Sequence, residues 1–214
     1  MIIINSSARM KSKPSTETML ETECLFGETI EILDVFQDWF YCKLRTDNYH
    51  GWVEKKNLGL HRDATHRVIN IRSFIYKDAD LKSDVEIYLP MGSNLAVKKI
   101  NSCWAEIYFP VDNKITVGYV PAKDIVKFQH KVSDWVGVAE SLEGTPYKWG
   151  GRDTVGLDCS GLLQLTYQTY GQIIPRNTSD QVKLNKPVVN KMNDLIRGCV
   201  VFWEGHVGIM IDKE

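Results

Sequence analysis

The segment Gly156-Leu157-Asp158-Cys159-Ser160-Gly161-Leu162 decides the fold of the C-terminal part of this chain. Glycine-containing stretches at residues 144–146 and 150–151 precede it and predict an irregular loop. After it, residues recur at the spacing of one helix face and stop before Gly171: Leu162, Leu163, Thr166, Tyr167 and Tyr170. A helix is therefore predicted to begin at or next to Cys159.

Cys159 is the best placed of the five cysteines to act as a nucleophile. A thiolate is the attacking species, and the free N–H groups and positive dipole end of a helix N-terminus stabilise it. The preceding glycines let the backbone approach a substrate closely, and Asp158 adds a carboxylate. The other cysteines lie among strand-forming residues or beside a tryptophan, where we expect small buried side chains: Cys24, Cys42, Cys103 and Cys199. On local sequence alone, a structural role for Cys159 stays an alternative.

A catalytic cysteine needs a base, which usually comes from another element of the fold. Residues 198–203 and 206–211 predict a β-hairpin with Glu204-Gly205 as its turn. His206 opens the second strand and is the candidate base, with an ordinary surface histidine as an equal alternative on local sequence. The other histidines are expected in polar loops or the linker: His50, His61, His66 and His130.

The N-terminal part contains an internal repeat, and a helical segment follows it. The interval from Gly27 to Trp39 recurs from Gly92 to Trp104, and apolar residues alternate within each copy. Alternation is typical of half-buried strands, so each copy predicts a small antiparallel barrel. The closing strands are Gly51-Trp52-Val53 and Gly118-Tyr119-Val120. A helix before Gly144 is predicted from the spacing of Val132, Trp135, Val136, Ala139 and Leu142.

Composition narrows the classes of function. The net charge of -1 gives no general attraction to nucleic acid or anionic membranes, so neither partner is expected. No apolar run approaches the ~20 residues of a membrane span, and the apolar start is too short for a secretory signal. Five cysteines without C-x-x-C spacing argue against disulfides and zinc. We therefore expect reduced thiols, a cytoplasmic location and no metal or cofactor, and the oligomeric state stays open.

Several segments together resemble the signatures of the NlpC-type cysteine peptidases. They are Gly144-Thr145-Pro146-Tyr147-Lys148-Trp149-Gly150-Gly151, the segment around Cys159, Ile174-Pro175-Arg176, Gln181 and His206-Val207-Gly208-Ile209. The repeats similarly resemble bacterial SH3-type domains. The resemblance implies an α+β fold with two small SH3-like β-barrels, at residues 1–62 and 63–128, followed by a papain-like NlpC-type catalytic domain at residues 129–214.

The resemblance also implies an activity. Relatives with SH3-type barrels hydrolyse the bond between γ-D-glutamate and a diamino acid, commonly meso-diaminopimelate, in murein peptides. By this resemblance Cys159 would attack the scissile carbonyl, with its own backbone N–H at the oxyanion, and His206 would move the proton. The predicted function is therefore hydrolysis of peptides of the L-Ala-γ-D-Glu-meso-diaminopimelate type during cell-wall recycling.

Further substrate contacts follow from the same resemblance. Asp158 and Ser160 would bind the free amine of an N-terminal L-Ala and the adjoining peptide. The residues that would line the cleft are Tyr147 and Trp149 as walls, Thr178 as a hydroxyl contact, and Tyr49 as a barrel residue that closes the site. For Tyr49 a purely structural role is an equal alternative.

The resemblance implies a third polar residue about twelve positions beyond the base, where it would orient the imidazole as in a triad. The sequence stops at Glu214, and Asp212 lies too close along the same strand, so we expect no third member in residues 207–214. Either the chain lacks the end of the domain, or His206 lacks its usual orienter.

Two other functions stay open beside the peptidase. One is a catalytically weak or inactive murein-peptide-binding protein. The other, barrels that anchor an enzyme to polymeric wall, predicts export, against which the missing signal weighs. The preferred diamino acid and the need for a free N-terminal L-Ala also stay open.

Overall fold

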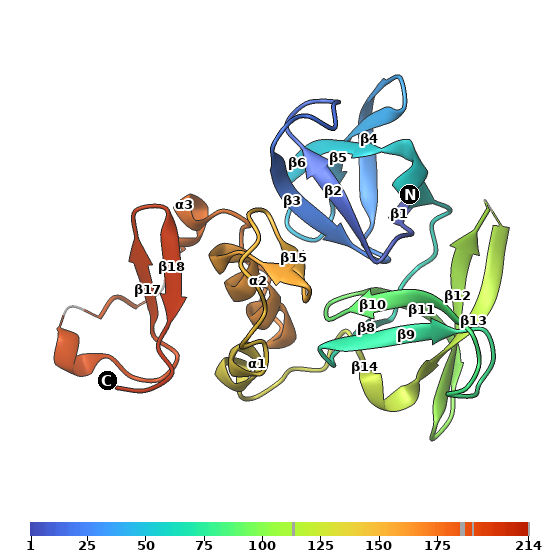
Figure 1. Cartoon of the computed structure of the whole chain (residues 1–214). Helices are drawn as coiled ribbons and strands as arrows, with labels where there is room; N and C mark the ends of the chain where they lie inside the picture. The colour runs from blue at the N-terminus through green and yellow to red at the C-terminus, as the bar shows by residue number, and fades with distance from the viewer. Residues whose placement is uncertain (113, 185–186, 190, 214) are drawn as a thin grey trace.

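Two β-sheet units and a C-terminal part with short helices make up the computed structural model, which describes residues 1–112, 114–184, 187–189 and 191–213 (Figure 1). The first unit is coloured blue to cyan, the second teal through green to yellow, and the C-terminal part dark yellow at α1 through orange to red. The chain is thus mostly β with few helices.

The first unit is a five-stranded antiparallel sheet in the order β3-β2-β6-β5-β4. Its strands are β2 (Ser7–Lys11), β3 (Leu20–Leu25), β4 (Ile30–Phe36), β5 (Trp39–Leu44) and β6 (His50–Glu54). The first and last strands of the unit, β1 (Ile2–Ile3) and β7 (Leu58–Gly59), pair with each other in a separate two-stranded sheet. The 3-10 turn η1 (Lys55–Asn57) precedes β7. Met10, Leu44 and Val53 lie in its buried core.

The second unit is a seven-stranded antiparallel sheet in the order β10-β9-β13-β12-β11-β8-β14. Its elements are β8 (His66–Val68), β9 (Arg72–Tyr76), β10 (Val85–Pro90), β11 (Asn94–Ile100), β12 (Trp104–Val111), β13 (Lys114–Pro121), η2 (Ala122–Asp124) and β14 (Ile125–Lys127). Its core includes Leu95, Ile107 and Val120. The burial of these side chains explains why apolar residues alternate along the strands of the repeat.

The glycines of the repeat occupy equivalent crowded positions. A Cβ at Gly118 would collide with Ile75 and Phe109, and a Cβ at Gly51 would collide with Met10. Each glycine therefore lets a strand approach the core side chains of its own unit.

Neither sheet closes on itself in the described residues, so the prediction of two closed barrels is not confirmed. Strands β3 and β4 are the edges of the first sheet, and β10 and β14 are those of the second. The edge strand β3 instead contacts β15 (Arg152–Asp153) of the C-terminal part. An exposed strand edge needs a cover, and here a later segment of the chain supplies it.

The C-terminal part is built around α2 (Cys159–Thr169). Its other elements are α1 (Trp135–Ser141), β16 (Gly156–Leu157), α3 (Thr178–Gln181), η3 (Met192–Asp194), β17 (Val200–Trp203) and β18 (His206–Ile209). The predicted helices and the predicted hairpin are thereby confirmed. Beyond α2, Gly171 adopts a φ of 85°, a conformation that favours glycine and ends the helix.

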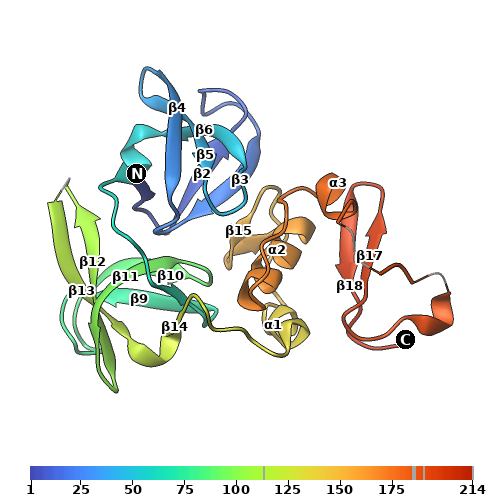
Figure 2. The same cartoon turned by 180° about the vertical axis from the view of Figure 1, so that it is seen from behind.

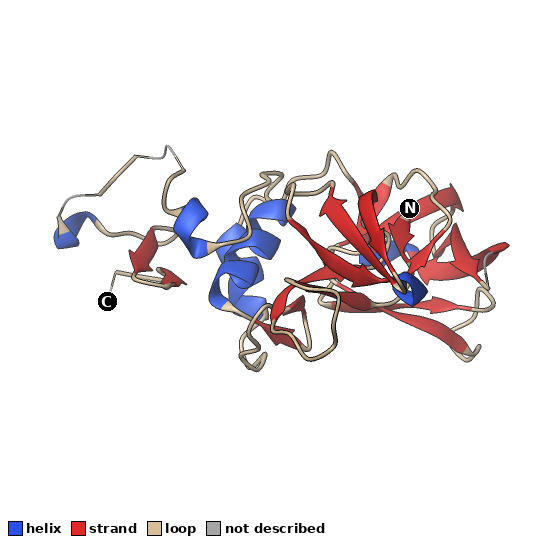
Figure 3. Ribbon diagram, turned by 90° about the horizontal axis from the view of Figure 1, so that it is seen from above, coloured by secondary structure: helices blue, strands red, loops and turns tan. Residues whose placement is uncertain are grey.

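Helix α2 packs on two sides. Leu165 joins an apolar cluster with Leu25 of the first sheet and Met91 beside the second. Leu163 belongs to another cluster with Val207 of the hairpin. Figures 2 and 3 show α2 between the sheet units and the hairpin. None of the described helices has the length and apolar character needed to cross a bilayer.

Replacing Ile107 with Ala is expected to lower the free energy of unfolding by about 2–5 kcal/mol, because truncating a fully buried side chain leaves a cavity. Denaturant titration followed by fluorescence measures the change. Ile100→Ala, on the exposed end of the neighbouring strand, is the control and should change it by about 0.5 kcal/mol or less. Equal losses in both variants would contradict the placement of Ile107 in the core.

Candidate active site

Cys159 is the first residue of α2 and is half-buried. The preceding residue, Asp158, caps the helix, because its Oδ1 accepts a hydrogen bond of 2.7 Å from the backbone N–H of Gly161. The thiol thus lies at the positive end of an eleven-residue helix. Such a position stabilises a thiolate, as expected for a nucleophilic cysteine.

The Asp158 carboxylate is buried and fully engaged by the protein. Arg176 donates to both of its oxygens, from Nη1 to Oδ1 at 2.9 Å and from Nη2 to Oδ2 at 2.6 Å. Gly150 N–H donates to Oδ2 at 2.9 Å, and the Ser160 hydroxyl donates to Oδ1 at 3.2 Å. This bidentate, charge-assisted pairing holds the start of α2 in place. A contact of Asp158 or Ser160 with substrate stays a prediction.

Arg176 has a role at this site that the sequence did not reveal. Its side chain is buried and also donates to Ser160 Oγ at 2.7 Å and, from Nε, to Thr22 Oγ1 of β3 at 2.8 Å. The available signal was a cation directly after Ile174-Pro175, since an arginine in an apolar context needs a buried partner.

Tyr147 lies beside Cys159 on the loop before β15. Desolvation raises its pKa, and the charge of Cys159 and a hydrogen bond with that thiol raise it further. Both Tyr147 and Trp149 nevertheless keep 61% of their surface exposed. The loop therefore borders the thiol and offers two aromatic side chains to solvent, and their role as cleft walls stays a prediction.

Tyr49 brings the first sheet to the same region. Its hydroxyl donates to Glu21 Oε2 at 3.2 Å and has the Asn177 side chain as a hydrogen-bond neighbour. Burial raises the pKa of Tyr49, the bond to Asn177 opposes the rise, and Glu21 adds to it. Asn177 precedes Thr178, the half-buried first residue of α3. The predicted contacts Tyr49 and Thr178 thus lie on segments that meet.

His206 is the first residue of β18, and its side chain is exposed. Its ring lies 5.8 Å from that of Trp203, between centroids. The next residue, Val207, packs in the apolar cluster to which Cys159 also belongs, so the hairpin lies against α2. Within the described residues, no hydrogen bond joins the imidazole to the thiol or to a third polar group. Glu214, the last position considered for that third group, lies outside the described residues.

Comparisons with known proteins now identify the C-terminal part. Residues 144–214 match the model of the NlpC/P60 family, and residues 11–58 match the bacterial dipeptidyl-peptidase Sh3 domain. The chain contains an NlpC/P60 domain. An SH3-type domain precedes it, and the SH3-type nature of the second sheet unit stays a prediction.

Proteins similar along most of the chain carry related names. A gamma-D-glutamyl-L-lysine dipeptidyl-peptidase of Bacillus subtilis is 28% identical over 92% of this chain and 71% of its own length. Dipeptidyl-peptidase 6 of Lysinibacillus sphaericus is 24% identical over 99% of this chain and 84% of its own. The crystal structure of an NlpC/P60 family protein from Bacillus cereus superposes with a TM-score of 0.82 at 18% identity, covering 98% of this chain and 87% of that one. It shares the fold.

The cysteines outside the NlpC/P60 domain differ from Cys159 in their surroundings. Cys24 and Cys42 are buried, and burial raises the pKa of Cys42 to about 12 and that of Cys24 well above its usual range. Cys103 is exposed, so its predicted burial was wrong: it lies in the turn between β11 and β12, outside the pairing that begins at Trp104. His66 was likewise expected in a loop but opens β8 and is buried.

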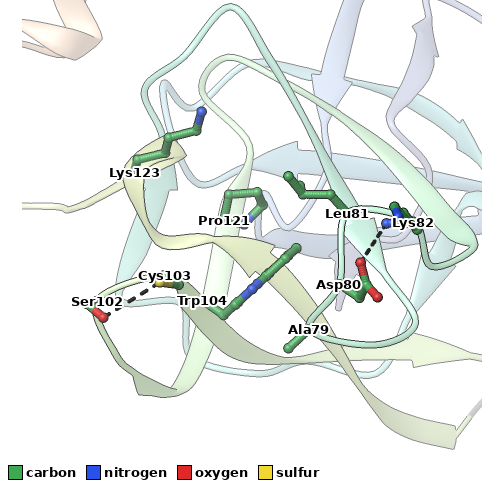
Figure 4. A pocket seen from close by; sticks show the side chains of 9 residues that line it. All are labelled: Ala79, Asp80, Leu81, Lys82, Ser102, Cys103, Trp104, Pro121 and Lys123. Atoms are coloured by element: carbon green, nitrogen blue, oxygen red, sulfur yellow. Dashed lines mark hydrogen bonds between the residues drawn. The ribbon is translucent and has the colours of Figure 1, made fainter.

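A hollow of about 680 Å³ on the second sheet is separate from the NlpC/P60 domain. Figure 4 shows its lining, with Trp104 and Pro121 from paired strands and Leu81 from the β9–β10 turn. Neither Cys159 nor His206 lines it. The described residues also hold no group of three or more His, Cys, Asp or Glu side chains suited to a metal ion.

Iodoacetamide at neutral pH is expected to label Cys159 faster than Cys103, because the helix N-terminus stabilises the attacking thiolate only at Cys159. Cys24 and Cys42 should stay unlabelled in the folded protein, since both are buried. Mass analysis of tryptic peptides over time measures the rates, and the unfolded chain is the control in which all sites react alike. Equal rates at Cys159 and Cys103 would speak against an activated nucleophile.

Asp158→Asn is expected to lower the free energy of unfolding by about 3–5 kcal/mol, because it leaves the buried Arg176 guanidinium without its counter-charge. Denaturant titration measures the loss. Asp180→Asn removes an exposed pair with Lys183 and should cost about 1 kcal/mol or less. The structural role of Asp158 is refuted by a loss no larger than in this control.

Proposed function

We propose that this chain is a cysteine peptidase that hydrolyses the γ-D-Glu–diamino acid bond of murein-derived peptides. The observation that carries the proposal is Cys159 at the first position of α2, with Asp158 capping that helix and locked by Arg176. The match to the NlpC/P60 family, whose peptidases are cysteine peptidases, supports the reaction class. The name of the Bacillus subtilis relative, a gamma-D-glutamyl-L-lysine dipeptidyl-peptidase, supports the bond that is cleaved.

The chemistry follows from the positions of the side chains. The Cys159 sulfur attacks the γ-carbonyl carbon while its proton passes to His206, and the C–N bond then breaks as His206 returns the proton to the leaving amine. Water, deprotonated by His206, hydrolyses the thioester and frees the thiol. The Cys159 N–H, which has no partner within the helix, supplies one oxyanion donor. The Tyr147 hydroxyl, beside the thiol, offers a second.

The first sheet would bind the amino end of the peptide. Glu21, hydrogen-bonded to Tyr49, supplies a carboxylate for the ammonium group of an N-terminal L-Ala. Asp158 and Ser160, already held by Arg176, would shape the neighbouring wall. A site bordered in this way suits short free peptides rather than polymeric wall. We therefore infer a role in peptide recycling in the cytoplasm.

Incubation with L-Ala-γ-D-Glu-meso-diaminopimelate and with its L-Lys counterpart tests the function. Mass analysis should show release of the L-Ala-D-Glu dipeptide from at least one of them. Cys159→Ala should abolish the release, and His206→Ala should lower kcat by roughly 10²–10⁴-fold, the usual contribution of a general base. Cys103→Ala is the matched control with unchanged activity. Blocking the substrate amine by acetylation should raise KM, as should Tyr49→Phe.

One observation favours a second candidate, a murein-peptide-binding protein with little or no turnover. His206 has no orienting hydrogen bond among the described residues, and such a partner holds a catalytic imidazole in the required tautomer. Intact peptide after long incubation, together with calorimetric binding of the same peptide, would establish the binder instead of the enzyme.

A further inference from the structure

A buried ion cluster lies between the first sheet and the loop that leads to Cys159. Arg152 is 1% exposed, Glu28 0% and Glu23 2%. Arg152 Nη1 donates to Glu28 Oε2 at 2.9 Å, and Nη2 donates to Glu28 Oε1 at 3.0 Å. Charged side chains are almost never buried so completely unless they are paired. The two hydrogen bonds between Arg152 and Glu28 provide this pairing.

Glu23 of β3 holds the backbone of the same loop. Its Oε2 accepts hydrogen bonds from the N–H groups of Arg152 at 3.1 Å and Asp153 at 3.3 Å. Its Oε1 pairs with the Lys148 ammonium group, and its main-chain carbonyl accepts from Arg152 Nη1 at 2.9 Å. A single residue of the first sheet, Glu23, therefore binds both ends of the segment 148–153.

That segment is also the one that contacts the start of α2. Gly150 N–H donates to the Asp158 carboxylate, and the Gly151 carbonyl accepts from Asp158 N–H at 3.3 Å. Tyr147, the residue before Lys148, contacts the Cys159 thiol. Moving the segment would displace the cap of the helix and the tyrosine hydroxyl together.

Stability alone does not account for this cluster. Burial disfavours the charged form of Arg152, but the attraction of Glu28 outweighs it, and the pKa of Arg152 lies above its ordinary value. Arg152 therefore stays charged at working pH. Well-packed apolar residues often replace a buried ion pair without loss of stability, whereas they cannot reproduce its fixed, directional geometry.

We propose that Arg152, clamped by Glu23 and Glu28, is a positioning residue that sets the Tyr147 loop and the cap of α2 against Cys159. The inference rests on the proposed peptidase function. It makes the first sheet part of the catalytic framework, acting on the nucleophile across the domain boundary through one arginine.

The double variant Arg152→Met/Glu28→Met tests the proposal in this chain of 214 residues, because it removes both buried charges at similar volume. We expect a folded protein by circular dichroism with kcat lowered on the order of 10- to 100-fold, as for a small misplacement of reacting groups. KM should change less than kcat. The labelling rate of Cys159 relative to Cys103 should fall, a change that a merely structural role would not produce.

The matched control is Lys98→Met/Glu106→Met, which removes an ion pair of the second sheet and should leave kcat and the labelling ratio unchanged. Wild-type kcat and labelling ratio in the folded Arg152→Met/Glu28→Met variant would overturn the proposal. If that variant does not fold, Arg152→Lys takes its place, because it keeps the positive charge but cannot pair with Glu28 through two N–H groups. Its kcat and its labelling ratio then decide for or against the proposal in the same way. If the wild-type protein cleaves no peptide, the proposed function fails, and the labelling ratio still tests the positioning.

Discussion

The ion pair between Asp158 and Arg176 is the interaction on which the site depends. Asp158 caps the helix that begins at Cys159. The Arg176 guanidinium that pairs with Asp158 also donates a hydrogen bond to Thr22 of the first sheet. One buried contact thus joins three parts of the fold: helix α2, the segment before α3, and strand β3. Because both charges are removed from water, neither partner can be lost without leaving the other uncompensated.

The N-terminal sheet is part of the framework around Cys159, because it contacts the C-terminal part through buried polar side chains. A small β domain ahead of a peptidase is easily taken for a separate module on a flexible linker. Here β3 supplies Thr22, Glu23 and, just beyond it, Glu28 to partners in the C-terminal part. The edge strand β3, which a closed barrel would pair with its own strand, contacts β15 of the C-terminal part instead.

Local patterns predicted the local structure well. Helical spacing and a terminal glycine located α2, and strand alternation around a turn located the hairpin of His206. The buried cluster could not be predicted, since Glu23 and Arg152 are 129 residues apart and both types normally lie on the surface. The exposure of Cys103 could not be predicted from its sequence neighbours either. It depends on where strand pairing begins, and β12 pairs only from Trp104 onward. Local position made Cys159 and His206 candidates for nucleophile and base, whereas the roles of the other site residues came from family signatures. All of these roles are predictions.

The two halves of the proposed catalytic pair are built with different rigidity. The thiol lies at a helix start fixed by buried charges, whereas His206 lies exposed on a two-stranded hairpin that is held to α2 by apolar packing around Val207. Apolar packing fixes where the hairpin lies but not how an imidazole is turned, because dispersion contacts have little directionality. Catalytic hydrogen bonds often tighten only in the complex with substrate. On the proposed mechanism, the protein therefore preorganises the nucleophile, and the bound peptide, lying between the two side chains, orders the base.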